Sequence, residues 1–357
     1  MTADVAPEEI VAREEVPVTM GIAAAPETPA AAVEDVRKAE RTDRIVGTIQ
    51  RQGALAVLIV VVVIAFLAFP NFRSFDNTAT ILVAAAPPML IALGMTFVIL
   101  TGGIDLSVGS LYVLGGVLAA WASQYGFVAA FAVPLAVCAM IGLVNGALIA
   151  YTGMAPFIVT LAALLGARGL MRAISDEGST TYLVKNHAFG RFGNGSLLGL
   201  GYPVWLAAVL VLLGMVLLDR TRFGHSVYAV GGSADAAALM GVPVRRIKVA
   251  VYVMSGLLAG LAGAINAAKL GSGVTVLGTG MELDAIAAVV IGGTLLTGGA
   301  GTIAGTVAGV LLLGVIQNLI NQVGNVNSNW QQVISGAFLA LVVVAQTYLV
   351  KLRRVSW

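Results

Sequence analysis

The chain has 357 residues, of which 59% are hydrophobic and 11% are charged, and its formal net charge is +2. Globular chains carry about 25% charged residues, so this composition excludes a soluble protein and indicates several membrane-spanning segments. The small net charge argues against a nucleic-acid partner. The single cysteine, Cys138, and the two histidines, His187 and His225, are too widely separated to suggest a metal site, and we expect neither a metal nor a cofactor.

Residues 1–52 predict a mostly disordered cytoplasmic tail, because they are rich in Ala, Pro, Glu and Val. The tail begins with acidic residues and ends with basic ones. A secretory signal would begin with basic residues and continue into an apolar core, so we expect no cleavage. The basic segment 35–52 fits either a short helix on an anionic membrane surface or a solvated linker.

Residues 53–350 predict an all-α transmembrane domain, a polytopic helix bundle of about ten spans, followed by a short cytoplasmic C-terminus at 351–357. With an even number of spans and a cytoplasmic N-terminus, most of the 20 lysines and arginines fall inside, in agreement with the positive-inside rule. Arg168 and Arg172, near the outer end of the fifth span, fit this topology least well. The expected spans are 54–70, 78–100, 108–123, 127–151, 157–174, 203–218, 249–268, 283–298, 300–319 and 332–350.

Asp105 lies in a glycine-rich break between two apolar runs, far in the sequence from any other acidic residue. A carboxylate inside a membrane costs about 2.5–3.5 kcal/mol on insertion scales, so such groups usually face a bundle interior or a water-filled path. Together with Thr101 and Ser107, Asp105 either lines a translocation pathway or caps the next helix through backbone N–H groups. Asn145, inside another apolar run, either contacts the solute or bonds across helices.

Two polar segments interrupt the apolar runs, 175–202 outside the membrane and 219–248 inside. In the second segment, Ser233 or Asp235 can cap a short helix that ends at Gly241. A capped helix in a basic cytoplasmic loop suits docking to another protein, although an ordinary surface loop fits the pattern equally well. The candidate docking residues are Gly232, Ser233, Asp235, Ala236, Leu239 and Gly241.

Glu282 and Asp284 lie at the start of the eighth expected span, near the outer surface. They could meet basic residues of an extracytoplasmic partner. The alternative is that they cap the span, since carboxylates are favourable near a helix N-terminus.

A weak internal repeat appears when Gly102 is aligned with Gly292, because the same offset aligns Ser107 with Thr297. Transporters often arise by duplication and carry corresponding broken helices at the binding region. The repeat therefore predicts two opposite walls of one pathway and adds Thr297 to its candidate residues. Chance matching is the alternative, since the chain has 43 glycines.

The sequence contains no G-x-x-x-x-G-K-[ST] phosphate loop and no G-x-S-x-G or H-E-x-x-H motif. We therefore expect no catalytic residues and no enzymatic activity. Few ionisable residues fall within the spans, so coupling to a proton or sodium gradient has little support. Uphill transport would take its energy from another subunit, attached at 219–248.

Six runs of the sequence carry a resemblance to a known family. They are FVILTGGIDLSVGS, APFIVTLAALLGARGL, TRFGHSVYAVGGSADAAALMGV, VYVMSGLLAGLAGAINAAKLGSG, ELDAIAAVVIGGTLLTGG and WQQV. In this order they resemble the ribose-type, monosaccharide permease family of bacterial ABC importers, over roughly residues 50–350. The chain departs from that pattern at Ser233, where Asn is usual, at Ala238, where a basic residue is common, and at Ala300, where Arg is common. These departures concern the ATPase contact and the last glycine loop.

The resemblance implies a permease that pairs with a second copy or a related permease, with broken helices lining a pore at the dimer interface. It also implies two further partners, a cytoplasmic ABC ATPase that contacts 219–248 and a periplasmic or lipid-anchored sugar-binding protein. Glu282 and Asp284 would then face that binding protein. The implied substrate is a monosaccharide such as ribose or xylose.

We therefore expect a multi-pass subunit of a bacterial inner membrane, with both termini in the cytoplasm. Its expected function is translocation of a monosaccharide, driven by ATP hydrolysis on the separate ATPase subunit. The alternative is a self-sufficient secondary transporter or facilitator of a small polar solute, which would need an internal ion site or no energy source.

Overall fold

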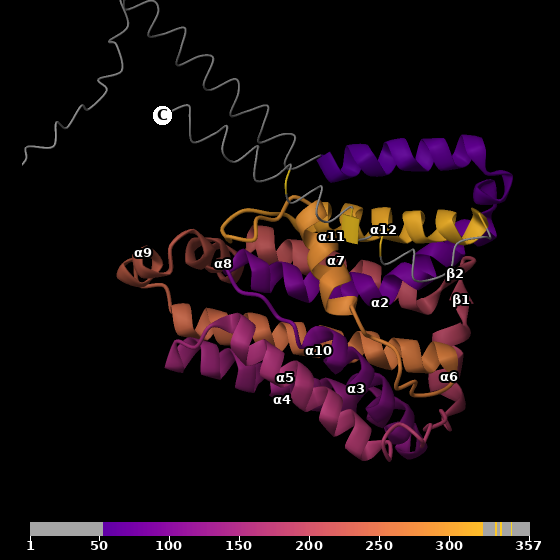
Figure 1. Ribbon diagram of the computed structural model, residues 1–357, viewed down its shortest axis with the longest axis horizontal. Helices are drawn as coiled ribbons and strands as arrows, with labels where there is room; N and C mark the ends of the chain where they lie inside the picture. Colours follow the sequence, from indigo (N-terminus) through magenta and orange to yellow (C-terminus); the bar gives the residue numbers. More distant parts are fainter. Residues whose placement is uncertain (1–52, 324–332, 334–335, 338–343, 345–357) are drawn as a thin grey trace, which may run out of the picture. The chain divides into compact units, whose positions relative to one another are not determined.

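The computed structural model describes residues 53–323, 333, 336–337 and 344 (Figure 1). The expected tail at 1–52, the C-terminus at 351–357 and most of the expected last span at 332–350 lie outside the described residues. The described part is almost entirely helical. Its one sheet is a short antiparallel pair of strands with Leu197 opposite Leu200.

The described elements follow one another along the chain in a simple order. They are the helix Gly53–Ala68, η1 (Pro70–Arg73), α2 (Phe75–Leu100), α3 (Val108–Ala122), η2 (Ser123–Tyr125), α4 (Phe127–Thr152), α5 (Pro156–Ile174), α6 (His187–Asn194), β1 (Ser196–Leu197), β2 (Leu200–Gly201), α7 (Tyr202–Arg220), α8 (Arg222–Gly232), α9 (Ala234–Leu239), α10 (Val244–Leu270), α11 (Met281–Ile291) and α12 (Ile303–Val323).

Within the described residues, 6 helices are long and apolar enough to cross a membrane, namely α2, α4, α5, α7, α10 and α12. This confirms the predicted all-α, polytopic class. Every predicted span before 332 overlaps a helix. Three of these helices, Gly53–Ala68, α3 and α11, are shorter than the 6 long apolar helices. α3 has 15 residues and α11 has 11, whereas a straight crossing needs about 20.

α11 departs most from the predicted spans. The sequence predicts one apolar span over 283–298, but the helix ends at Ile291. The reason is Gly293, whose φ of 90° lies in the left-handed region that glycine adopts without strain. α2 ends in the same way at Leu100, before Gly102 with a φ of 76°. Two broken regions, 101–107 and 292–302, therefore interrupt the bundle.

α10 is the central helix and packs against α2, α3 and α4. Small residues allow this, as is usual where membrane helices approach closely. A Cβ atom added to Gly256 would overlap the carbonyl of Cys138, and one added to Gly260 would lie 2.8 Å from the Cβ of Cys138. The buried Cys138 is therefore a packing residue.

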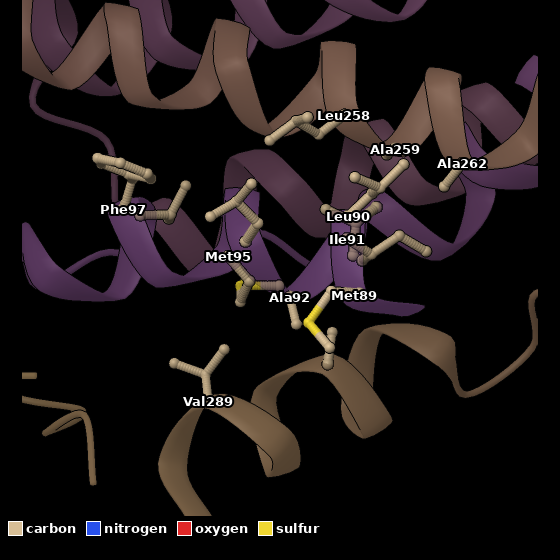
Figure 2. Packing of buried hydrophobic residues seen from close by; sticks show 14 of the residues in the cluster. Met89, Leu90, Ile91, Ala92, Met95, Phe97, Leu258, Ala259, Ala262 and Val289 are labelled. Atoms are coloured by element: carbon tan, nitrogen blue, oxygen red, sulfur yellow. The ribbon is translucent and has the colours of Figure 1, made fainter. Parts of the chain in front are cut away.

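α2 packs between α10 on one side and α11 on the other, as Figure 2 shows. The labelled α2 residues are Met89, Leu90, Ile91, Ala92, Met95 and Phe97. They meet Leu258, Ala259 and Ala262 of α10 and Val289 of α11. The most apolar window of α2 is 78% buried, whereas those of α4 and α5 are 22% buried. α2 is thus an interior helix, and α4 and α5 turn most of their apolar surface outward.

Candidate functional site

The break after α2 turns sharply and is held by backbone hydrogen bonds. The N–H of Gly102 donates to the carbonyl of Ile99 at 2.8 Å, and the N–H of Gly103 donates to that of Val98 at 3.1 Å. This is the usual way of ending a helix with glycine in the left-handed region. The predicted pathway residue Thr101 is buried here and donates its hydroxyl to the carbonyl of Val98 at 2.8 Å.

Asp105 is fully buried, at 0% exposure, and both its carboxylate oxygens accept hydrogen bonds. Oδ1 accepts from the backbone N–H of Ser107 at 3.0 Å and from the Ser107 hydroxyl at 2.5 Å. Oδ2 accepts from the hydroxyl of Ser255 in α10 at 2.8 Å. The amide of Asn145 in α4 donates to the Ser107 oxygen at 3.3 Å. The structure thus brings the predicted residues Asp105, Ser107 and Asn145 into one buried network.

The same break is tied to two further helices through the carbonyl of Ile104. That carbonyl accepts from the Tyr252 hydroxyl of α10 and from the Thr160 hydroxyl of α5, both at 3.3 Å. Sequence reasoning missed Tyr252, Ser255 and Thr160. Tyr252 and Ser255 carried a signal, because two polar residues three positions apart in an apolar run lie on one face of a helix.

The second break resembles the first, but not in the predicted register. The N–H of Gly293 donates to the carbonyl of Val290 at 2.9 Å, so Gly293 occupies the position of Gly102. The predicted alignment of Gly102 with Gly292 is therefore wrong by one residue at this point. The second break is also longer than the first, and Thr302 caps the helix that follows it. The Thr302 hydroxyl accepts from the N–H of Gly305 at 3.0 Å.

Three glycine-containing segments meet in one place, which we call the glycine junction: Leu100–Gly102 at the end of α2, Gly231 near the end of α8, and Gly298–Gly299 in the second break. The N–H of Gly299 donates to the carbonyl of Leu100 at 2.9 Å. A Cβ atom on Gly231 would overlap the Leu100 carbonyl, and one on Gly298 would lie 2.8 Å from the nitrogen of Gly102. The end of α8 therefore packs directly against both breaks.

Two more contacts describe the surroundings of the glycine junction. Tyr228 of α8 donates its hydroxyl to the carbonyl of Gly301 at 2.8 Å. The predicted pathway residue Thr297 is exposed, and its carbonyl would lie 3.5 Å from a Cβ on Gly102. The backbone of Thr297 therefore lies beside Gly102, the residue after Thr101.

The segment 219–248 contains the predicted short helix. The Ser233 hydroxyl accepts from the N–H of Ala236 at 3.2 Å and caps α9, while Gly241 follows the helix at a φ of 81°. Asp235 lies in the first turn. Leu239 is 90% exposed, so an apolar side chain points away from the protein at the end of this helix. Ser233 and Gly241 shape the ends of α9, as the pattern predicts, and Gly232 is the last residue of α8.

A basic surface lies beside α9. A cavity of about 560 Å³ is lined by Asp235, Arg245, Arg246 and Lys248. The guanidinium of Arg245 also stacks over the ring of Tyr151, with 5.7 Å to the ring centroid. An exposed apolar side chain beside such a charged rim is typical of a protein docking surface.

Glu282 and Asp284 lie in the first turn of α11, but their side chains are half-buried. The Glu282 Oε2 atom is enclosed beside Gly109 and has no hydrogen-bond partner among the described residues. Asp284 lines a cavity between α2, α11 and α12. In the part of the chain that the structure describes, neither carboxylate accepts a hydrogen bond from the start of α11, so the capping alternative is not observed. Docking to a partner stays a prediction.

Comparisons with known proteins give a consistent result. Residues 77–343 match the family model described as "Branched-chain amino acid transport system / permease component". The ribose import permease protein RbsC of Escherichia coli K12 is 41% identical over 300 residues, covering 83% of this chain and 93% of the relative. The L-arabinose ABC transporter permease protein AraH of Azospirillum brasilense is 36% identical over 302 residues, covering 84% and 88%. The inner membrane ABC transporter permease protein YjfF of Escherichia coli K12 is 40% identical over 290 residues, covering 78% and 85%. No solved structure matches the chain.

Proposed function

The chain belongs to the family of branched-chain amino acid transport system permease components, and from this premise we propose that it is the permease subunit of an ATP-driven ABC importer for a monosaccharide. A permease component is a non-catalytic, multi-pass membrane subunit, so ATP hydrolysis belongs to a separate protein. The choice of a monosaccharide rests on relatives named for ribose and L-arabinose. Because these relatives are named for different sugars, the proposal is for the class and not for one sugar.

The observation that carries the proposal is the link from α9 to both broken regions. α9 exposes Leu239 at a charged surface, and α8 directly before it packs through Gly231 against Leu100 and Gly299. Packed helices move as rigid units, so a displacement of α9 reaches both breaks through α8. We infer that the ATPase binds at Asp235, Ala236 and Leu239, and that its ATP-driven movement opens and closes the pathway.

The pathway residues divide into two groups under this proposal. Thr297 is exposed at the glycine junction and is the candidate for contact with the solute, whereas the buried Thr101 hydroxyl donates to the carbonyl of Val98. Asp105, Ser107 and Asn145 hold the first break in position, because their hydrogen bonds are made within the protein. Their role is to position the break, with no need for contact with the solute.

The remaining parts of the proposal follow from the family and from the sequence. A second copy or a related permease would complete the pore, and an extracytoplasmic sugar-binding protein would deliver the solute. One relative is named as an inner membrane permease, and we propose the same location here, with both termini in the cytoplasm. The outward apolar faces of α4 and α5 are available for lipid or for the second copy.

The test is affinity purification of the tagged full-length protein from native membranes in mild detergent. We expect an ABC ATPase to copurify with the wild type and to be lost from the Asp235→Arg, Leu239→Asp double variant. Leu183→Asp is the matched control for the leucine change, because Leu183 is also exposed, at 65%, but lies outside 219–248. This control should retain the ATPase.

Two results would contradict the proposal. If the wild type is intact, brings down no ATPase and still transports sugar in vesicles without ATP, the protein is a self-sufficient transporter. If the ATPase stays bound to the double variant, the docking surface is elsewhere in the chain.

A further inference from the structure

A cavity of about 170 Å³ lies between α2, α11 and α12, and nothing in the function proposed so far uses it. Its lining contains both polar and apolar side chains, and each of the three helices contributes some of both. The polar ones are Thr80, Asp284, Gln317, Asn318 and Asn321. The apolar ones include Ile81, Ile91, Ala288, Val310 and Leu313.

Asp284 is the charged residue of the cavity wall. It is half-buried, and no hydrogen bond or ion pair to its carboxylate is found among residues 53–323. A partly desolvated carboxylate without a partner is costly in a membrane bundle, and ionisable groups in such positions usually serve a solute pathway. The carboxylate is therefore available as a hydrogen-bond acceptor for a bound molecule.

The Asn318 carboxamide of the cavity lining is held in place by Asn77 and Gln322. Asn318 donates to Asn77 at 2.9 Å, Asn77 donates back at 3.3 Å, and Gln322 donates to Asn318 at 2.8 Å. An amide nitrogen carries two N–H donors, so Asn318 keeps one donor beyond its bond to Asn77. The Gln317 amide makes no hydrogen bond within the described part of the chain. These two side chains can therefore donate to a molecule in the cavity.

The backbone of α2 adds one more polar group. Pro88 lines the cavity and has no N–H, so the carbonyl of Ala84, four residues earlier, lacks its usual helical donor. Ala84 also lines the cavity. A hydroxyl group of a bound molecule can supply the missing donor.

This combination of groups selects a class of ligand. A carboxylate and a carbonyl accept hydrogen bonds, the amides both donate and accept, and the apolar side chains can contact the C–H face of a ring. Among the described residues that line the cavity there is no Lys, Arg or His, so they offer no cation for the carboxylate of an amino acid or for a phosphate. A cavity of about 170 Å³ has room for a small solute.

We propose that this cavity is a solute subsite for a neutral monosaccharide, bound by Asp284, Gln317 and Asn318. The inference rests on the proposed importer function and names the place where the sugar contacts this subunit. It also gives Asp284 a role different from docking of a binding protein. Glu282, whose carboxylate points toward Gly109, is not part of the subsite.

The first experiment measures access to the cavity and does not depend on transport. The Thr80→Cys change is made in a Cys138→Ala background, because Thr80 lines the cavity without being one of the three proposed sugar-binding residues, and Cys138 is the single cysteine of the chain. Full-length protein in membrane vesicles is treated with a charged, membrane-impermeant thiol reagent, with D-ribose, L-arabinose or D-xylose added in excess. L-Leucine at equal concentration is the comparison solute, and Leu283→Cys is the control position, since Leu283 lies beside Asp284 but is 56% exposed and does not line the cavity.

The expected result is that Thr80→Cys reacts and that at least one of the sugars slows its reaction. A sugar at its dissociation constant occupies half the sites and halves the labelling rate. L-Leucine should leave the rate unchanged, and Leu283→Cys should react equally with and without sugar. The proposal is overturned if Thr80→Cys does not react, if no sugar protects it, or if leucine protects it as well as the sugars do.

The second experiment tests Asp284 in the complete importer. Asp284→Asn keeps the size of the side chain and removes its charge, so the half-saturating sugar concentration for import should rise about tenfold, the effect of losing one charge-assisted hydrogen bond. Leu283→Ala is the matched control. An unchanged half-saturating concentration in Asp284→Asn, with the ATPase still bound, overturns the subsite and leaves the importer function standing. Loss of the ATPase from the wild type would instead contradict the importer function, whatever the labelling shows.

Discussion

Asp105 and Asp284 show two ways in which this apolar bundle accommodates a carboxylate. Asp105 is fully buried, and its two oxygens accept hydrogen bonds from Ser107 and Ser255. Asp284 is half-buried at a cavity and has no partner among the described residues. A saturated polar network makes a buried region rigid and specific. A charge in a membrane bundle is therefore structural where neighbouring groups hydrogen-bond to it, and it is available to a ligand where they do not.

The same contrast separates the two regions around these residues. At the glycine junction, backbone atoms of Leu100, Gly231 and Gly299 are in direct contact, with no room for a Cβ atom on Gly231. The cavity between α2, α11 and α12 has space for a small molecule. One region therefore transmits movement by close packing, and the other can receive a solute.

The largest change in the free energy of unfolding is expected when the carboxylate of Asp105 is removed. Asp105→Ala leaves the hydroxyls of Ser107 and Ser255 without their acceptor inside the protein, and we expect a loss of about 3 kcal/mol in the free energy of unfolding. Asp284→Ala should change it by less than about 0.5 kcal/mol, because no protein group depends on that carboxylate. Denaturant unfolding in detergent measures both. Equal losses would show that Asp284 is also structural.

A second pair of variants tests how much the Ser255 hydroxyl contributes to the Asp105 network. Ser255→Ala removes a hydrogen bond to a buried carboxylate, so we expect a loss of about 2 kcal/mol. Ser110→Ala is the matched control, since the Ser110 hydroxyl is buried but has no hydrogen-bond partner among the described residues. The control should be neutral or slightly stabilising in the same unfolding measurement. A neutral Ser255→Ala would mean that the hydroxyl of Ser255 is not needed by Asp105.

A third pair tests the glycine junction, and the two positions are adjacent. Gly231→Ala places a methyl group on the carbonyl of Leu100, and we expect a loss of about 1–3 kcal/mol together with reduced ATP-dependent import. Gly232→Ala meets no atom within 4 Å. It should retain both stability and import. If Gly231→Ala imports normally, close contact between α8 and the breaks is not required for coupling.

The smallest change in stability is expected at Ser233, which caps the exposed helix α9. Ser233→Ala removes the side-chain cap of α9 and should destabilise that helix by about 1 kcal/mol. Hydrogen exchange of the amides in α9 should become faster by about fivefold to tenfold, while global unfolding is unchanged. Ser233→Asn, which preserves a capping oxygen, is the control and should exchange like the wild type. Unchanged exchange in Ser233→Ala would show that other contacts hold α9.

Local sequence signals predicted much of the fold. Each apolar run before 332 coincides with a helix, because a helix in a membrane must satisfy its backbone polar groups within itself. The cap at Ser233 and the end at Gly241 also follow from neighbouring residues alone. The end of α11 at Ile291 was missed, because the apolar residues beyond it continue the pattern of a span after the helix has ended. The repeat register was misjudged for a related reason: glycines are so frequent that several alignments look alike.

The membrane class, the positions of most helices and the carboxylate in a break were all predicted from the sequence. These features depend on composition and on residues that are close together in the chain. Only the tertiary structure decided which distant groups complete that break. Ser255 reaches Asp105 from α10, while Thr160 reaches the carbonyl of Ile104 from α5. The tertiary structure also decided that Asp284 faces a cavity. The physical reason is that these contacts join residues far apart in sequence, and which faces of two helices meet depends on how side chains of many helices pack together.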